Sequence, residues 1–186
     1  MTSKRYIALL RGINVGRAKR VAMADLRTLV ADLGHTDVRS LLNSGNIVFG
    51  AGDIDPLAAA KAIEEAMVLK LGVAARVMVL GDAVLAAVLA ENTLLPLSTD
   101  HARLLVFLLP DAAARAAIAP LCERDWGEGA LAVGQHAAYV WCPDGVLDSP
   151  AAAALGKQLG DMTTSRNWNT LCKLYALCTE APRTRM

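Results

Sequence analysis

The chain has 186 residues, of which 54% are apolar and only 4% aromatic, and its 19 Lys and Arg nearly balance its 18 Asp and Glu. A chain of this length buries about 70% of its unfolded surface, so we expect an ordered core that needs no disulfide, metal or cofactor. The many alanines predict thin helices packed closely on sheets. The composition excludes a disordered protein.

The cysteines argue against a metal centre. Cys122, Cys142, Cys172 and Cys178 form no CxxC pair and have no histidine at zinc-finger spacing, so we assign no metal ligand and expect reduced thiols. No apolar run approaches the length of a membrane span, and the first apolar run is too short for a signal peptide. We therefore expect a cytoplasmic protein with no membrane partner.

Positive charge is concentrated near the N-terminus. The first 50 residues hold eight Lys and Arg against three Asp and Glu, and Arg11, Arg17, Lys19 and Arg20 fall within ten positions. This is a local patch that attracts anions rather than the broad basic face of a nucleic-acid-binding protein. Charge alone leaves open a solvated basic loop with no ligand.

Hydrophobic periodicity predicts a βαββαβ order in the first half of the chain. The predicted helix at 24–33 has Leu26, Leu29, Val30 and Leu33 on one face. The turn at 43–46 separates the two strands of a predicted hairpin. The predicted elements, in chain order, are a strand at 5–10, a helix at 24–33, strands at 38–42 and 47–49, a helix from 56 to 71 and a strand at 75–80. This order is typical of the split βαβ, or ferredoxin-like, arrangement.

The second half repeats the pattern after a third helix from Asp82 and a linker at 93–100. Its predicted elements are a strand at 103–109, a helix at 111–121, a hairpin at 130–133 and 137–142, a helix from 150 and a closing helix that presents Trp168 to the core. We therefore predict an α/β (α+β) protein with two ferredoxin-like units, residues 1–94 and 95–186, each an antiparallel sheet covered by helices.

The loop after the first strand is the first candidate site. Gly12 and Gly16 do not match the spacing of a Walker or dinucleotide loop, which leaves a glycine-bearing loop with nearby cations. Strands one and two of a split βαβ unit run parallel, so this loop and the hairpin turn emerge at the same end of the sheet. Arg11, Gly12, Asn14 and Gly16 then meet Ser44 and Asn46, although such residues are also common in turns for conformational reasons alone.

No catalytic group can be assigned from the sequence. His35, His101 and His136 are scattered, and Ser44 has no identifiable base. Whether the protein is an enzyme therefore stays open. At the start of the closing helix, Arg166 and Asn167 offer polar side chains that could cap the helix or reach outward.

Three stretches together resemble the bacterial domain of unknown function 1697 family: ALLRGINVGRAKRVAMADLRTL, LNSGNIVF and TTSRNWNTLCKL. The resemblance spans nearly the whole chain and implies two ferredoxin-like units and no established activity. The family's RGINVG pattern falls on residues 11–16, its SGN turn on 44–46 and its RNW on 166–168, which adds Arg166 and Asn167 to the ligand-binding candidates. The chain departs from the family at Arg17, Ala22 and Pro150, and Arg17 in particular weakens the case for a close backbone approach to a phosphate.

The leading hypothesis is a protein that binds a small anionic ligand, a phosphate or a nucleotide-like molecule, at this loop cluster. A nucleic-acid-binding module is one alternative, which is disfavoured because the first sheet offers only Tyr6 and Phe49 for stacking. A protein-interaction or regulatory module that forms a homodimer is the other.

Overall fold

The computed structural model describes residues 4–15 and 20–180. It is a mixed α+β structure with two four-stranded antiparallel sheets, which confirms the predicted fold class. Close packing divides the chain into two compact units, Met1–Ala83 together with Lys173–Met186, and Val84–Cys172. The sequence predicts a boundary between independently folding domains after residue 94. That boundary stays a prediction, because the two compact units are defined by packing alone.

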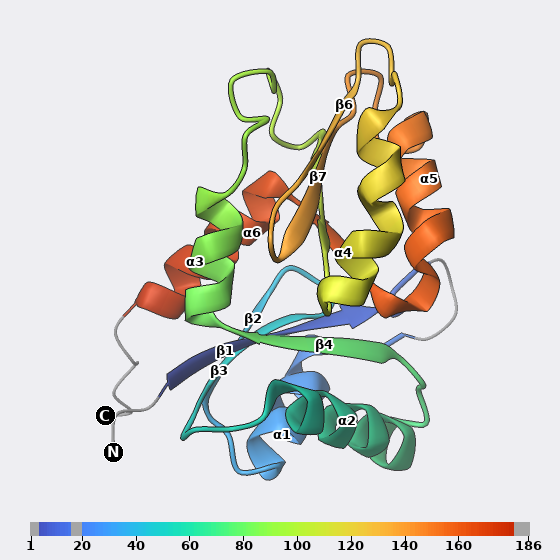
Figure 1. The fold of residues 1–186 in the computed structure, drawn as a ribbon. Helices are drawn as coiled ribbons and strands as arrows, with labels where there is room; N and C mark the ends of the chain where they lie inside the picture. Colours follow the sequence, from blue (N-terminus) through green and yellow to red (C-terminus); the bar gives the residue numbers. More distant parts are fainter. Residues whose placement is uncertain (1–3, 16–19, 181–186) are drawn as a thin grey trace. The chain divides into compact units, whose positions relative to one another are not determined.

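The first unit is one sheet with two helices on one of its faces (Figure 1). Its strands lie in the order β2-β3-β1-β4, and every neighbouring pair is antiparallel. β1 and β2 therefore run in the same direction with β3 between them, an order compatible with the ferredoxin-like expectation. The elements are β1 (Lys4–Arg11), α1 (Met23–Asp32), β2 (Thr36–Leu41), β3 (Asn46–Ala51), α2 (Pro56–Ala66), a π-helical turn (Met67–Leu71) and β4 (Arg76–Gly81).

Alternation along β1 determines what each face of this sheet presents. Tyr6, Ala8 and Leu10 pack in the core beneath α1 and α2. Arg11, next in the strand, therefore lies on the opposite face. The core itself is built as the sequence predicts, with the inward face of α1 contributing three buried aliphatic side chains, Leu26, Leu29 and Val30.

The two helices of the first unit begin differently. Asp55 caps α2, where its carboxylate accepts hydrogen bonds from the N–H groups of Leu57 at 3.1 Å and Ala58 at 3.3 Å. At α1 the N-cap position is occupied by Ala22, and no side chain caps the helix. The first N–H groups of an α-helix have no partner within the helix, so the start of α1 is suited to an outside acceptor.

The second unit has the same strand order as the first, β6-β7-β5-β8 with antiparallel neighbours. Its elements are α3 (Asp82–Ala90, which begins at the unit boundary), β5 (Leu104–Leu108), α4 (Ala112–Ile118), a 3₁₀ turn (Ala119–Glu123), β6 (Ala130–Val133), β7 (Ala137–Trp141), α5 (Pro150–Leu159), a 3₁₀ turn (Gly160–Met162), β8 (Thr164–Asn167) and the start of α6 (Trp168–Thr179), which belongs to the first unit from Lys173 onward. α4 and α5 cover one face of the sheet (Figure 1). On the other face, the Tyr139 hydroxyl donates to the carbonyl oxygen of Val88 in α3 at 2.6 Å.

The closing segment differs in part from its prediction. The sequence predicts the helix that carries Trp168, and the structure confirms both the helix and the burial of that indole, which is 6% exposed. The sequence does not predict β8, a strand of four residues that ends directly before α6. Its sequence TSRN has no apolar alternation and no residue of strong strand preference except Thr164, so it is held by pairing with β5 rather than by local propensity.

Among the described residues, no helix combines the length and apolar character that a membrane crossing requires.

Candidate functional site

The β1–α1 loop and the β2–β3 turn lie side by side, as the parallel direction of β1 and β2 predicts. The backbone N–H of Leu10 donates to the carbonyl oxygen of Gly45 at 2.8 Å, and the Asn14 side chain donates to the carbonyl oxygen of Asn43 at 2.7 Å. This confirms the expected adjacency for loop residues 12–15. The candidate Gly16 and its neighbour Arg17 lie outside the described residues.

Gly45 allows this close approach. Its φ is +79°, in the left-handed region, and a Cβ atom there would lie 2.7 Å from Leu10 Cβ and 2.9 Å from Ile13 Cδ1. Both distances are shorter than carbon atoms tolerate, and the left-handed backbone disfavours any other residue. The turn therefore contacts the loop only because this position has no side chain.

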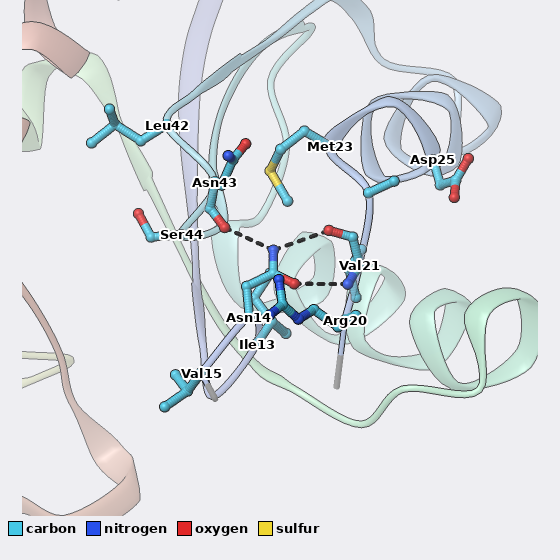
Figure 2. A pocket seen from close by; sticks show the side chains of 11 residues that line it. Ile13, Asn14, Val15, Arg20, Val21, Met23, Asp25, Leu42, Asn43 and Ser44 are labelled. Atoms are coloured by element: carbon cyan, nitrogen blue, oxygen red, sulfur yellow. Dashed lines mark hydrogen bonds between the residues drawn. The ribbon is translucent and has the colours of Figure 1, made fainter. Parts of the chain in front are cut away.

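Asn14 joins three backbone segments through one amide group. Its Nδ2 donates to the carbonyl oxygens of Asn43 at 2.7 Å and Val21 at 3.0 Å, and its Oδ1 accepts the N–H of Val21 at 2.8 Å (Figure 2). Its φ of 55° is one that asparagine adopts more readily than most residues. Both N–H donors are used within the protein, so Asn14 shapes the site and retains only oxygen lone-pair capacity for a ligand.

An open surface pocket of about 880 Å³ lies where these segments meet (Figure 2). The loop contributes Ile13, Asn14 and Val15, and the turn contributes Leu42, Asn43 and Ser44. The third side is the chain entering α1, from Arg20 to Met23, with Asp25 in the first helical turn. The pocket therefore includes the uncapped start of α1.

The charges at the pocket oppose each other in part. Arg20 is the cation among the described lining residues, and it stands just before the positive end of the α1 dipole. Asp25 brings a carboxylate to the same helix end. An anion in the pocket would be attracted by Arg20 and by the helix terminus, and repelled by Asp25.

Ser44 and Asn46 act together at the turn. Asn46 is fully buried, and its Nδ2 donates to the carbonyl oxygen of Leu41 at 3.0 Å and to Ser44 Oγ at 2.9 Å. Ser44 lines the pocket. Asn46 therefore orients Ser44 and fixes the turn rather than lining the pocket itself.

Arg11 and Gly12 are not among the lining residues of the pocket. Arg11 is paired across the sheet with Arg76 of β4, and Asn46 is paired with Leu9. Leu9 and Arg11 are two residues apart in β1, so Arg11 and Asn46 share the sheet face that is turned away from α1 and α2. Gly12 has a φ of +79° with open space around it, and it lets the chain leave the strand.

The β1–α1 loop and the β2–β3 turn both lie within a stretch of the chain that matches a protein-family model. Residues 3–139 match the model described as "Protein of unknown function (DUF1697)". The chain belongs to the DUF1697 family. This match covers both the β1–α1 loop and the β2–β3 turn, and the description of the DUF1697 family assigns no activity to either.

A solved structure shares the fold of this DUF1697 chain. It is that of a conserved bacterial protein, SP0830 from Streptococcus pneumoniae, with a TM-score of 0.72 and 22% sequence identity. The alignment covers 96% of this chain and 100% of that one. No curated protein matches the chain.

The remaining candidates of the DUF1697 chain lie in the second unit. The Arg166 guanidinium donates to Thr164 Oγ1 at 3.0 Å and to the carbonyl oxygen of Ser165 at 2.8 Å, and burial lowers its pKa to about 10. Arg166 therefore remains a cation at neutral pH. Asn167 caps α6, because its Oδ1 accepts the N–H of Thr170 at 2.9 Å.

Sequence reasoning missed part of the pocket. Arg20 belongs to the basic patch of the sequence, but no sequence pattern marks it as a site residue, and none marks Met23 or Leu42. One signal was available: Ala22 stands before the helix where Ser, Thr, Asp or Asn is usual. Nothing in the sequence indicates that Leu42 adopts a φ of 59° at the rim of the pocket.

Proposed function

We propose that the first unit binds a small anionic ligand, a phosphate or a nucleotide-like molecule, in the pocket between the β1–α1 loop, the start of α1 and the β2–β3 turn. The observation that carries the proposal is the uncapped start of α1, at Ala22, which lines the same pocket as Arg20. Backbone N–H groups at a helix start, together with a guanidinium, are the usual protein partners of a phosphate.

The size and lining of the pocket support the same ligand class. About 880 Å³ lies within the range of small-molecule and cofactor sites. Val15 and Leu42 at the rim are 73% and 56% exposed, and they offer apolar surface to the less polar part of a ligand. The proposal concerns binding, and it assigns no reaction.

Calorimetric titration with inorganic phosphate and with a nucleoside monophosphate, at low and high salt, tests the proposal. We expect binding that weakens with salt, because charged groups near the surface are screened. Arg20→Gln should weaken it about 10-fold through loss of a charge-assisted contact. Asp25→Asn should strengthen it, because the variant removes the opposing carboxylate from the pocket.

Arg115→Gln is the matched control, because Arg115 is an exposed arginine of α4 in the second unit and its loss changes the net charge equally. It should leave phosphate binding unchanged. Equal loss in Arg20→Gln and Arg115→Gln, or no binding of either anion at low salt, contradicts the proposal.

A further inference from the structure

A second depression of about 760 Å³ lies in the first unit, between α1 and the edge strand β2. It is lined by four α1 residues, Ala24, Arg27, Thr28 and Ala31, and by residues 35–38, and it shares no lining residue with the loop pocket. Ala24 and Ala31 are small, so the helix leaves room beside β2. We refer to this depression as the α1–β2 groove.

Arg27 brings the positive charge of the groove. Its Nη1 donates to Ser40 Oγ at 2.6 Å, which fixes the half-buried guanidinium against β2. Among the described residues, no carboxylate forms an ion pair with Arg27. A guanidinium has five N–H donors, and one neutral hydroxyl engages a single one of them.

The carboxylate that lines the groove is already neutralised by other arginines. Asp37 accepts hydrogen bonds from Arg5 and, at 3.0 Å and 2.8 Å, from Arg39, which also contacts Glu180 at 3.0 Å. Burial alone would raise the pKa of Asp37, but the hydrogen bonds from Arg39 and Arg5 outweigh it and lower the pKa. Asp37 is therefore ionised and committed to two cations, so it does not offset the charge of Arg27.

His35 supplies a neutral donor in the same groove. The centroid of its ring lies 4.4 Å from the ring centroid of the fully buried Phe49, and this contact holds the imidazole in position. Burial lowers the pKa of His35, so the imidazole is neutral at neutral pH and carries one N–H donor and one acceptor. Thr28 adds a hydroxyl from α1.

We propose that the α1–β2 groove is a second binding site of this protein and that it takes a small oxyanion, a carboxylate or a phosphate, paired with Arg27 and hydrogen-bonded by His35. The charge balance carries the proposal: the guanidinium is held in a groove whose own carboxylate is paired elsewhere. Carboxylate and phosphate oxygens match the planar fork of a guanidinium, so either group satisfies the donors that Ser40 leaves.

The histidines provide a direct measurement. The chain has three, His35, His101 and His136, so the loss of one imidazole NMR signal in His35→Asn assigns His35. We expect inorganic phosphate or acetate, titrated separately, to shift the His35 signal saturably. Saturation by phosphate alone identifies a phosphate site, and saturation by acetate as well identifies a site for oxyanions in general.

The arginines then separate this groove from the loop pocket. Arg27→Gln should weaken the effect on His35 at least about 10-fold, and Arg27→Lys, which retains the charge without the fork, should weaken it less. Arg20→Gln should leave it unchanged, whether or not the loop pocket binds an anion. Ser40→Ala should retain the effect, because it removes the anchor and not the charge.

No saturable shift of His35 with either anion overturns the proposal. So does a shift that persists unchanged in Arg27→Gln, or one that disappears with Arg20 instead.

Discussion

Three residues other than glycine have a positive φ among the described residues, and each lines one of the two depressions. Asn14 and Leu42, at 55° and 59°, line the loop pocket, and Asp37, at 43°, lines the α1–β2 groove. Such conformations cost about 1 kcal/mol or more and persist where surrounding contacts hold them. Asn14 and Asp37 are held by the hydrogen bonds described above. Leu42 is exposed, so the turn itself imposes its conformation.

Gly45 provides a prediction at this scale. Gly45→Ala should lower the free energy of unfolding by about 2 to 4 kcal/mol, because the added Cβ meets Leu10 at 2.7 Å and the backbone is left-handed. Urea denaturation measures this change. Gly12→Ala is the control: it has the same φ of +79° with no atom within 4 Å of the added Cβ, so it should lose only about 1 kcal/mol. Equal losses in the two variants would show that the contact with Leu10 contributes nothing.

At the scale of single elements, the start of α1 links stability to binding. Ala22 has the extended backbone of an N-cap residue, with φ −71° and ψ 135°. Ala22→Asp should therefore cap α1 and raise the free energy of unfolding by about 1 kcal/mol. The same carboxylate would occupy the helix end where we propose that an anion binds, so phosphate binding should weaken about 10-fold.

The stability and the phosphate affinity of Ala22→Asp should thus change in opposite directions. Denaturation measures the first and calorimetry the second. Ser149→Ala is the matched control, because Ser149 caps α5 in the second unit through a hydrogen bond from the N–H of Ala152 at 3.2 Å. It should lose about 1 kcal/mol of stability without any change in phosphate binding. A stabilised Ala22→Asp variant that binds phosphate as the parent does would place the ligand elsewhere.

The elements that the sequence predicted are those with strong local signals. The caps at Asp55, Asp111 and Ser149 and the apolar periodicity of the helices were enough to find them. β8 was missed because its pairing with β5 comes from distant residues. At the site, the parallel direction of β1 and β2 was enough to predict that Asn14 and Ser44 lie together at one pocket. The orientation of Arg11 toward the other sheet face was not predictable from topology alone, because it depends on the alternation along the whole of β1.

At the scale of the whole molecule, the ion pairs around Asp37 connect distant parts of the sequence within the first unit. The lowered pKa of Asp37 means that its stabilising contribution is fully present above its unfolded value of about 3.9 and is lost as the pH falls through the folded value. The free energy of unfolding of the parent should therefore fall more between about pH 5 and pH 2 than that of Asp37→Asn.

Acid denaturation of both proteins, followed by circular dichroism, measures the difference. Asp148→Asn, which removes an exposed carboxylate of the second unit, is the control for net charge and should follow the parent. Parallel pH profiles for the parent and Asp37→Asn would mean that the Arg5 and Arg39 contacts do not stabilise the folded state.

The first compact unit is built from two segments that are far apart in the sequence, one ending at Ala83 and one starting at Lys173, and this has a consequence during synthesis. Arg39 belongs to β2, yet its partner Glu180 follows 141 residues later. A ribosome that adds about 5 to 20 residues each second reaches Glu180 roughly 7 to 30 seconds after Arg39. Once β4 has been completed at Gly81, the nascent first unit has all four strands of its sheet and both covering helices, but it still lacks the segment from Lys173 onward. The second unit is translated in full before the first can be completed.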